Sequence, residues 1–400
     1  IKYSMGKRKL DITLSKINSS LELAIKWLEK SGIQNFLGKN AGSVNAWYDP
    51  KRKKYSFIYS EINGYFLTTS VYLYKKTNNK KFIELGLKSA KWLIKKAQHK
   101  NGGFRCLFIV DKKSPHIFKQ NQIYAFDNGV ILNGLVSIFK ITKKKYILKS
   151  AIKCASWLIN SCIDSSYSVK PLYEISENKF YESDKEWSTT SGSYHTKVAM
   201  GLANLYSVTK QKKYLKYATK ICDKSIQYQN KSGRFLSFPF KGGTNLHPHC
   251  YAAEGLWSIG CYLKNKKFIN SSLKGTQWIF NMLKNGKPPR LYLKEKVIYH
   301  QRIDALAQTL RLFFLHQNLN KKIRTKERNI NNILKYLLSF QYKKNKNKKT
   351  SGSFKWGKTS FGKIKPHPNS WVTFFAIQTL YLIKDSLTQD KSNLDPFDLI

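Results

Sequence analysis

The chain has 400 residues, 42% of them hydrophobic and 14% aromatic, so it can bury a large core and is not a disordered polymer. It carries 72 Lys and Arg against 23 Asp and Glu, a formal net charge of +49, which is compatible with an acidic glycan as partner. The basic residues are scattered and accompany no nucleic-acid-binding motif, so we expect no specific nucleic-acid partner. No apolar run reaches the ~18 residues of a transmembrane helix, and the amino-terminal residues contain no signal-peptide core, which favours a cytoplasmic protein.

Two kinds of helical segment alternate along the chain. The first kind is amphipathic and rich in lysine, which is typical of a helix with one buried face. It occurs at 14–29, 81–98, 146–160, 214–229, 268–283 and 329–341. The second kind is rich in Gly, Ala, Ser and Thr and carries little charge, which is typical of an interior helix. It occurs at 62–74, 128–139, 194–208, 251–263, 303–315 and 370–383, and Pro248 is expected to keep the fourth of these from beginning earlier.

The alternation predicts six helical hairpins, each with an outer and an inner helix. We therefore expect an all-α protein, an (α/α)6 toroid of six inner and six outer helices. It would form a single domain over residues 1–400, with a C-terminal tail at 386–400. Short loops lead from each inner helix to the next outer helix, whereas long loops lead from outer to inner helices. The long loops all enter inner helices at their amino-terminal ends, so we expect the function at that end of the ring.

A repeated sequence follows several outer helices. It comprises Trp92-Leu93, Gln98 and Gly102-Gly103-Phe104, with counterparts at Gln229, Gly233, Phe235 and at Gln341, Gly352, Phe354. The whole arrangement resembles the (α/α)6-toroid enzymes that act on carbohydrates, namely glycoside hydrolases, polysaccharide lyases and epimerases. The outer-helix repeat also resembles that of prenyltransferases and squalene–hopene cyclases. The resemblance covers nearly the whole chain and concerns architecture, so it implies the fold more strongly than the chemistry.

Polar and aromatic side chains recur where the inner helices begin. If these ends meet around one axis, their side chains form a cleft with the usual composition of a ligand site. The candidate catalytic residues are Glu61, Asp127, Tyr194, His195, His249, Glu254 and Asp304. The candidate substrate-binding residues are Tyr65, Tyr124, Trp187, His247, Tyr251, Arg302, Trp356, His367, Asn369 and Trp371.

Two chemistries fit these residues. Hydrolysis of a glycosidic bond requires a carboxylic acid and a carboxylate. Glu61 or Asp127 would be the acid, and Glu254 or Asp304 would be the base.

Elimination, or C5-epimerisation of a uronate, instead requires a base for the proton next to a carboxylate and groups that neutralise that carboxylate. Tyr194 or His195 would be the base, with His249 and Asn369 holding the carboxylate. The sequence does not decide between the two chemistries.

Other functions fit less well. His247, His249 and Cys250 lack a second close pair of ligands, so we expect neither a metal nor another cofactor. An isoprenoid cyclase or prenyltransferase would need an Asp-rich or zinc-binding motif, and a non-catalytic glycan-binding toroid would not need the acids and histidines. We therefore predict an enzyme that cleaves an oligo- or polysaccharide, an acidic, uronate-containing one included. A uronate C5-epimerase of glycan biosynthesis is the alternative.

Overall fold

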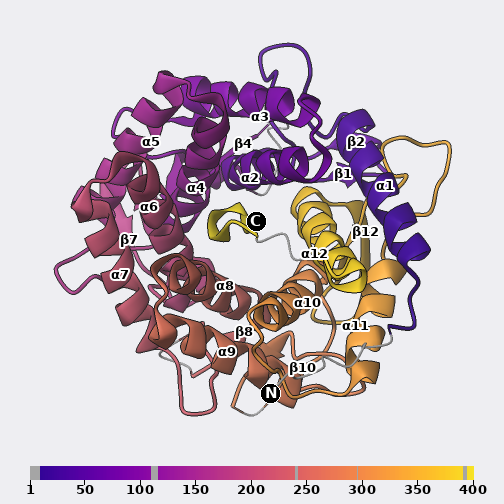
Figure 1. Cartoon of the computed structure of the whole chain (residues 1–400). Helices are drawn as coiled ribbons and strands as arrows, with labels where there is room; N and C mark the ends of the chain where they lie inside the picture. Colours follow the sequence, from indigo (N-terminus) through magenta and orange to yellow (C-terminus); the bar gives the residue numbers. More distant parts are fainter. Residues whose placement is uncertain (1–9, 110–115, 239–241, 295, 391–393) are drawn as a thin grey trace.

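Twelve α-helices alternate between an inner and an outer ring in the computed structural model, which describes residues 10–109, 116–238, 242–294, 296–390 and 394–400 (Figure 1). The inner helices are α2 (Ser60–Thr77), α4 (Ala125–Thr142), α6 (Thr196–Thr209), α8 (Leu246–Leu263), α10 (Ile303–Asn318) and α12 (Ser370–Thr388). The outer helices are α1 (Leu14–Lys30), α3 (Lys81–Trp92), α5 (Lys145–Trp157), α7 (Lys212–Ile226), α9 (Lys266–Asn281) and α11 (Glu327–Ser339). The predicted (α/α)6 toroid is confirmed.

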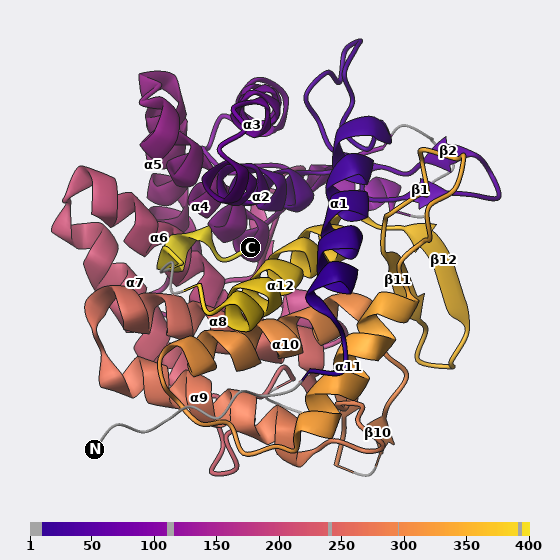
Figure 2. The same cartoon turned by 45° about the vertical axis from the view of Figure 1, so that its right-hand side comes forward.

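The ring is closed by its two ends. Each inner helix packs against the next, and α12 packs against α2. The first outer helix, α1, lies against α12, so the sixth hairpin joins the beginning of the chain to its end (Figure 2). The described helices include none that is both long and apolar enough to cross a membrane.

Burial explains why the two kinds of helix segregate. On α1 the apolar residues Trp27 and Leu28 are buried while the lysines face outward, whereas α8 is buried on all sides from Leu246 to Gly260. The inner helices approach one another closely at glycines. A Cβ atom on Gly129 would lie 2.6 Å from the Cα atom of Val198, so a larger residue would force α4 and α6 apart.

One helix begins earlier than its sequence suggests. The expectation that Pro248 would precede its helix is wrong, because α8 begins at Leu246 and includes Pro248 in its first turn. The first N–H groups of a helix have no partner within the helix, so a proline is tolerated there. Asn245 caps this helix by accepting a hydrogen bond from the backbone N–H of His247 at 3.1 Å.

The repeated Gln–Gly sequence forms the same connection between neighbouring hairpins each time. The Nε2 atom of Gln98 donates to the carbonyl of Gly102 at 2.9 Å and to that of Ser150 at 3.1 Å, and the Ser150 hydroxyl donates back to Gln98 Oε1 at 2.8 Å. Gln229 with Ser271 and Gln341 with Ser20 repeat this arrangement. These three glutamines therefore fasten their long loops to the next outer helix.

Short antiparallel strands stiffen the long loops. They are β1 (Tyr48–Asp49) with β2 (Lys54–Tyr55), β3 (Ile58–Tyr59) with β4 (Leu107–Phe108), β5 (Gln122–Tyr124) with β6 (Leu172–Glu174) and β7 (Lys179–Tyr181), β8 (Thr244–Asn245) with β9 (Leu291–Tyr292) and β10 (Val297–Ile298), and β11 (Lys355–Lys358) with β12 (Ile364–Pro368). Several of them lead directly into an inner helix, as β3 leads into α2 and β5 into α4. These strands therefore set where those inner helices begin.

Residues 394–400 occupy the centre of the ring near the carboxyl ends of the inner helices (Figure 1). The carbonyl oxygen of Phe397 accepts a hydrogen bond from Asn133 on α4 at 2.9 Å, and that of Pro396 accepts one from Ser258 on α8 at 2.7 Å. The side chains of Phe397, Asp398, Leu399 and Ile400 are buried. This part of the predicted tail, which we call the central plug, thus closes one end of the toroid.

Candidate active site

A cavity with a volume of about 150 Å³ lies among the amino-terminal ends of the inner helices. It is lined by Tyr59, Glu61, Ile62, Tyr65, Tyr124, Phe126, Asp127, Trp187, Ser188, His247, Tyr251, Arg302 and Trp371. The structure thus brings together nine of the predicted site residues. The cavity is at the end of the ring that the long loops predicted, and the central plug lies at the other end.

Two carboxyl groups of the cavity, Glu61 on α2 and Asp127 on α4, have raised pKa values. Burial and then the charge of Glu61 raise the pKa of Asp127 well above its ordinary value. Burial raises the pKa of Glu61 to about 7, although hydrogen bonds from Tyr59 and Tyr65 and the charge of Arg302 oppose this rise. Near neutral pH Glu61 is therefore close to its midpoint, and the raised pKa of Asp127 favours its protonated form.

Asp127 has an oxygen available for a ligand. Its Oδ1 atom lies 3.5 Å from the hydroxyl of Tyr59, while Oδ2 is buried and has no hydrogen-bond partner among the described residues. A buried polar atom without a partner is costly, and such atoms are often completed by a substrate. Because the raised pKa of Asp127 favours its protonated form, this carboxyl group can donate a hydrogen bond or a proton to such a ligand.

Aromatic side chains make up about half of the residues that line the cavity. The hydroxyl oxygens of Tyr65 and Tyr251 lie within hydrogen-bond distance at 2.6 Å, and the two rings are nearly parallel. Trp187 and Phe126 both contact the ring of Tyr251. Flat apolar surfaces with a few polar groups are usual in ligand pockets.

Asp304, at the start of α10, lies behind the cavity and holds two of its lining residues. Its carboxylate accepts two hydrogen bonds from Arg302, at 3.1 and 2.5 Å, and one from Trp371 at 2.9 Å. Burial would raise the pKa of Asp304, but Arg302 and then His247 lower it to about 2. Asp304 is thus an ionised group that positions Arg302 and Trp371, and it does not itself line the cavity.

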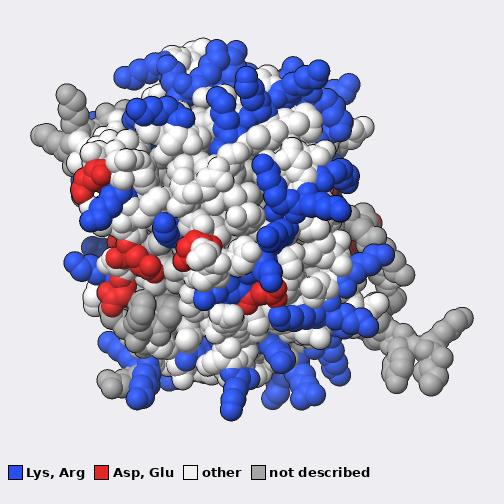
Figure 3. Space-filling view, turned by 90° about the vertical axis from the view of Figure 1, so that its left-hand side faces the viewer, with Lys and Arg blue, Asp and Glu red and all other residues white. Residues whose placement is uncertain are grey.

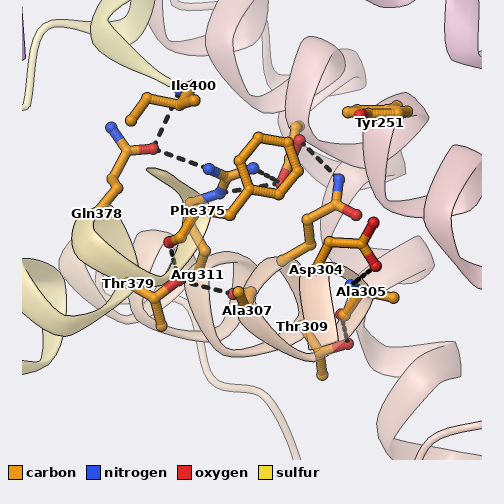
Figure 4. Close-up of polar contacts among 12 residues, drawn as sticks. Tyr251, Asp304, Ala305, Ala307, Thr309, Arg311, Phe375, Gln378, Thr379 and Ile400 are labelled. Atoms are coloured by element: carbon orange, nitrogen blue, oxygen red, sulfur yellow. Dashed lines mark hydrogen bonds and ion pairs between the residues drawn. The ribbon is translucent and has the colours of Figure 1, made fainter. Parts of the chain in front are cut away.

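Glu254 lies one level deeper, in a cluster of buried charges. Its Oε1 atom accepts hydrogen bonds from Arg311 at 3.0 and 2.5 Å, and its Oε2 atom lies 3.3 Å from Lys197 Nζ. Figure 4 shows Arg311 beside the ring of Phe375 and bonded to Gln378, which in turn accepts a hydrogen bond from the backbone of Ile400. Glu254 therefore connects the inner helices to the central plug and does not reach the cavity.

His247 and His249 are two residues apart on α8 and point in different directions. His247 lines the cavity, and burial lowers its pKa to about 4. His249 uses both ring nitrogens for backbone groups: Nδ1 accepts from Phe235 N–H at 3.1 Å, and Nε2 lies 3.0 Å from the Gly275 carbonyl. His249 thus joins α8 to α9 and the preceding loop.

The residues predicted for elimination are also away from the cavity. Tyr194 donates to the backbone carbonyl of Thr190 at 2.8 Å, and His195 contacts the backbone of Gly192 through Nδ1. Asn369 caps α12 by accepting from Val372 N–H at 3.1 Å. The described groups that line the cavity thus lack the proposed base and carboxylate-holding pair.

Two further predicted residues, Trp356 and His367, lie outside the lining. Arg290 and Arg302 each lie 5.3 Å from the Trp356 ring, and Lys365 lies 5.5 Å from it. His367 lies 3.7 Å from the carboxylate of Asp49. No group of three or more His, Cys, Asp or Glu side chains suited to a metal ion occurs within the described residues.

The predicted site residues did not include Tyr59 and Arg311. Tyr59 contacts both cavity carboxyls from the strand just before α2, and its position two residues before Glu61 was the available signal. Arg311 is fully buried, and an arginine within an otherwise apolar inner helix already implies a buried acidic partner.

Comparisons with known proteins agree with this architecture. Cellobiose 2-epimerase from Bacillus thermoamylovorans B4167 superposes with a TM-score of 0.72 at 11% identity, over 92% of this chain and 98% of that chain. An unsaturated glucuronyl hydrolase specific for heparin superposes with a TM-score of 0.66 at 13% identity, over 94% of this chain and 99% of that chain. An unsaturated glucuronyl hydrolase from Bacillus sp. GL1 superposes with a TM-score of 0.63 at 11% identity, over 94% of this chain and 98% of that chain. At these identities the likeness concerns the fold.

Sequence comparison is more specific. No curated protein sequence matches the chain significantly. However, the family model of the β-L-arabinofuranosidase GH127 catalytic domain matches residues 15–251, which is more than half of the chain. The chain is therefore a carbohydrate-active enzyme of the glycoside hydrolase type, and it belongs to the family of β-L-arabinofuranosidase GH127 catalytic domains.

Proposed function

We propose that this protein is an exo-acting glycoside hydrolase in which Asp127 is the general acid and Glu61 the general base. The observation that carries the proposal is the pair of cavity carboxyls, of which Asp127 has a raised pKa and an Oδ2 atom without a hydrogen-bond partner among the described residues. Asp127 would donate its proton to the glycosidic oxygen as the bond to the anomeric carbon breaks. Glu61 would accept a proton from the water that attacks that carbon, so that the two groups end with exchanged protonation states.

The shape of the cavity supports removal of a terminal sugar. Its volume of about 150 Å³ is below the roughly 300 Å³ at which pockets for drug-sized ligands begin. Residues 394–400 close the ring beyond it, and Asp398 and Ile400 are bonded there to Gln378. A chain end can enter such a cavity, whereas a continuous polysaccharide cannot pass through it.

Local charge supports an acidic sugar in the substrate. Arg302 lines the cavity, and Arg290 and Lys365 lie with it around Trp356. Burial and then the charge of Arg302 lower the pKa of Arg290, and a substrate carboxylate would relieve the repulsion between the two arginines. The net charge alone is a weaker argument, because on the face that Figure 3 shows Lys and Arg are scattered rather than gathered in one stripe.

A panel of defined substrates tests the proposal. The panel comprises p-nitrophenyl β-L-arabinofuranoside, other neutral p-nitrophenyl glycosides and an unsaturated uronyl disaccharide of heparin, with release of the terminal sugar as the measurement. We expect wild-type protein to release a sugar and Asp127→Asn to lose at least about 100-fold in kcat/KM. Asp223→Asn removes an exposed carboxylate that pairs with Lys267 on the outer surface, and it should match wild type.

The outcomes separate the parts of the proposal. Preference for the uronyl disaccharide supports the acidic substrate, whereas preference for a neutral glycoside contradicts that part only. An Asp127→Asn variant as active as wild type would contradict the assignment of the acid. Conversion of the sugar to an epimer without bond cleavage would replace hydrolysis with epimerisation.

A further inference from the structure

Three buried side chains form a line from the charge cluster to the cavity. Glu254 Oε2 accepts a hydrogen bond from Gln308 Nε2 at 3.3 Å, and Gln308 Oε1 lies 2.6 Å from His247 Nδ1. Glu254 and Gln308 are fully buried, and His247 is 4% exposed. His247 is the member of the line that reaches the cavity.

The donors and acceptors along this line can be assigned from Glu254. It is paired with Arg311 and Lys197, so it is a carboxylate and can only accept hydrogen bonds. Gln308 must therefore turn its NH2 group toward Glu254 and its carbonyl oxygen toward His247. A carbonyl oxygen cannot donate, so the proton between it and the imidazole belongs to Nδ1 of His247.

The other ring nitrogen of His247 is then left with a lone pair. Burial holds the pKa of His247 at about 4, so the ring is neutral near pH 7. The groups that act on it are Asp304, Arg302, Gln308 and Glu254. Asp304 Oδ2 lies 3.8 Å from Nε2, which is beyond hydrogen-bond distance, and no described residue donates to Nε2.

His249 shows what a purely structural histidine looks like on the same helix. Its two nitrogens are both used by backbone groups of neighbouring elements. His247 differs because its Nδ1 atom contacts the side chain of Gln308, which is itself held by Glu254, while its Nε2 atom has no such partner. This arrangement orients a ring nitrogen toward a ligand rather than joining two elements.

We propose that Gln308, held by Glu254, is a positioning residue that fixes His247 as its Nδ1–H tautomer and so presents Nε2 as an acceptor for a hydroxyl of the substrate sugar. The ligand chemistry is a hydroxyl donor, which a methyl ether or a deoxy sugar lacks. The use of this acceptor in catalysis rests on the proposed hydrolase function, but the tautomer does not.

Nitrogen NMR of the imidazoles tests the tautomer directly. Protein labelled with ¹⁵N-histidine is compared with a His247→Asn variant, in which the signals of that ring disappear. We expect the wild-type His247 signals to show a protonated Nδ1 and an unprotonated Nε2. In Gln308→Met, which is of similar size but offers no amide, we expect both signals to move toward the values of a tautomer mixture.

Gln378→Met is the matched control. Gln378 is a fully buried glutamine that contacts the same Arg311, at 3.0 Å, but faces the central plug instead of His247. It should lower the midpoint of thermal unfolding about as much as Gln308→Met and leave the His247 signals unchanged. A protonated Nε2 in wild type, or unchanged His247 signals in Gln308→Met, would overturn the inference.

Kinetics on the substrate found with the glycoside panel supply the second readout. We expect Gln308→Met to lower kcat/KM about tenfold or more, with Gln378→Met near wild type, because only the first loses the oriented acceptor. An equal loss in both variants would contradict the positioning role. If wild type cleaves no glycoside, the hydrolase proposal fails, while the NMR result still decides the tautomer.

Discussion

Two pairs of buried carboxyl groups differ in their electrostatic surroundings, although all four lie on inner helices. Asp127 and Glu61 line the cavity, with Tyr59 and Tyr65 as their main hydrogen-bond donors, and their pKa values are raised. Asp304 and Glu254 lie behind it, and each is bonded to an arginine. The comparison shows that an arginine bonded directly to the carboxylate, rather than burial, separates a carboxyl that orients other side chains from one that faces the cavity beside tyrosine hydroxyls.

The largest predicted effect concerns Glu254 and its cation. Arg311→Met leaves a fully buried carboxylate with only Lys197 as cationic partner, so we expect the free energy of unfolding to fall by about 3–5 kcal/mol. Urea unfolding followed by circular dichroism measures this. Glu254→Gln combined with Arg311→Met should recover part of the loss, because the carboxylate that lost its arginine is then removed as well, while Lys197 keeps its hydrogen bond to the Ile400 carbonyl oxygen. An Arg311→Met variant as stable as wild type would contradict the stabilising role of the Glu254–Arg311 pair.

The next effect concerns Glu61, whose replacement should raise the free energy of unfolding instead of lowering it. The pKa of Glu61 is about 7 in the folded protein against an ordinary 4.5, so its ionisation destabilises the fold as pH rises through 7. We expect Glu61→Gln to be more stable than wild type at pH 8, by roughly 1–3 kcal/mol, and no more stable at pH 4.5. Thermal unfolding at both pH values measures the difference. If wild type and Glu61→Gln were equally stable at pH 8, burial of the ionised Glu61 would not destabilise the fold.

The smallest of these effects concerns Asp304 in acid. Its folded pKa of about 2 lies below the ordinary 3.8, so it stabilises the fold above pH 4, and this contribution is lost as pH falls through 2. We expect Asp304→Asn to cost about 2 kcal/mol at pH 5, with a difference that narrows toward pH 2. A difference that is constant with pH would mean that the charge of Asp304 is not what stabilises the protein there.

The sequence predicted the helices because their apolar patterns are strong, and it predicted which end of the ring carries the cavity. Which side chains reach the cavity depends on the phase of each helix. On α8, residues two apart lie on different faces, so His247 reaches the cavity and His249 does not. Glu254 lies seven residues after His247 on the same face, two turns deeper. Helical spacing therefore predicts the face of a residue once the first turn is known.

The exact start of each inner helix was harder to predict. Pro248 shifted the expected start of α8 by several residues, and Tyr194 and His195 lie in a 3-10 turn before α6 rather than in the helix. The sequence also did not predict which buried charges pair with each other when they lie far apart along the chain. The distance between Glu254 and Arg311, for example, depends on how α8 and α10 pack within the ring.

The pH dependence of kcat/KM, on the glycoside that wild type cleaves, tests the central claim most directly. If Asp127 is the acid and Glu61 the base, only the form with one proton on the pair is active. We predict that kcat/KM of wild type rises with pH through about 7 and falls again at higher pH, and that Asp127→Asn loses at least about 100-fold at the optimum. A profile that rises near pH 4 and stays flat above it, with Asp127→Asn as active as wild type, would contradict the claim.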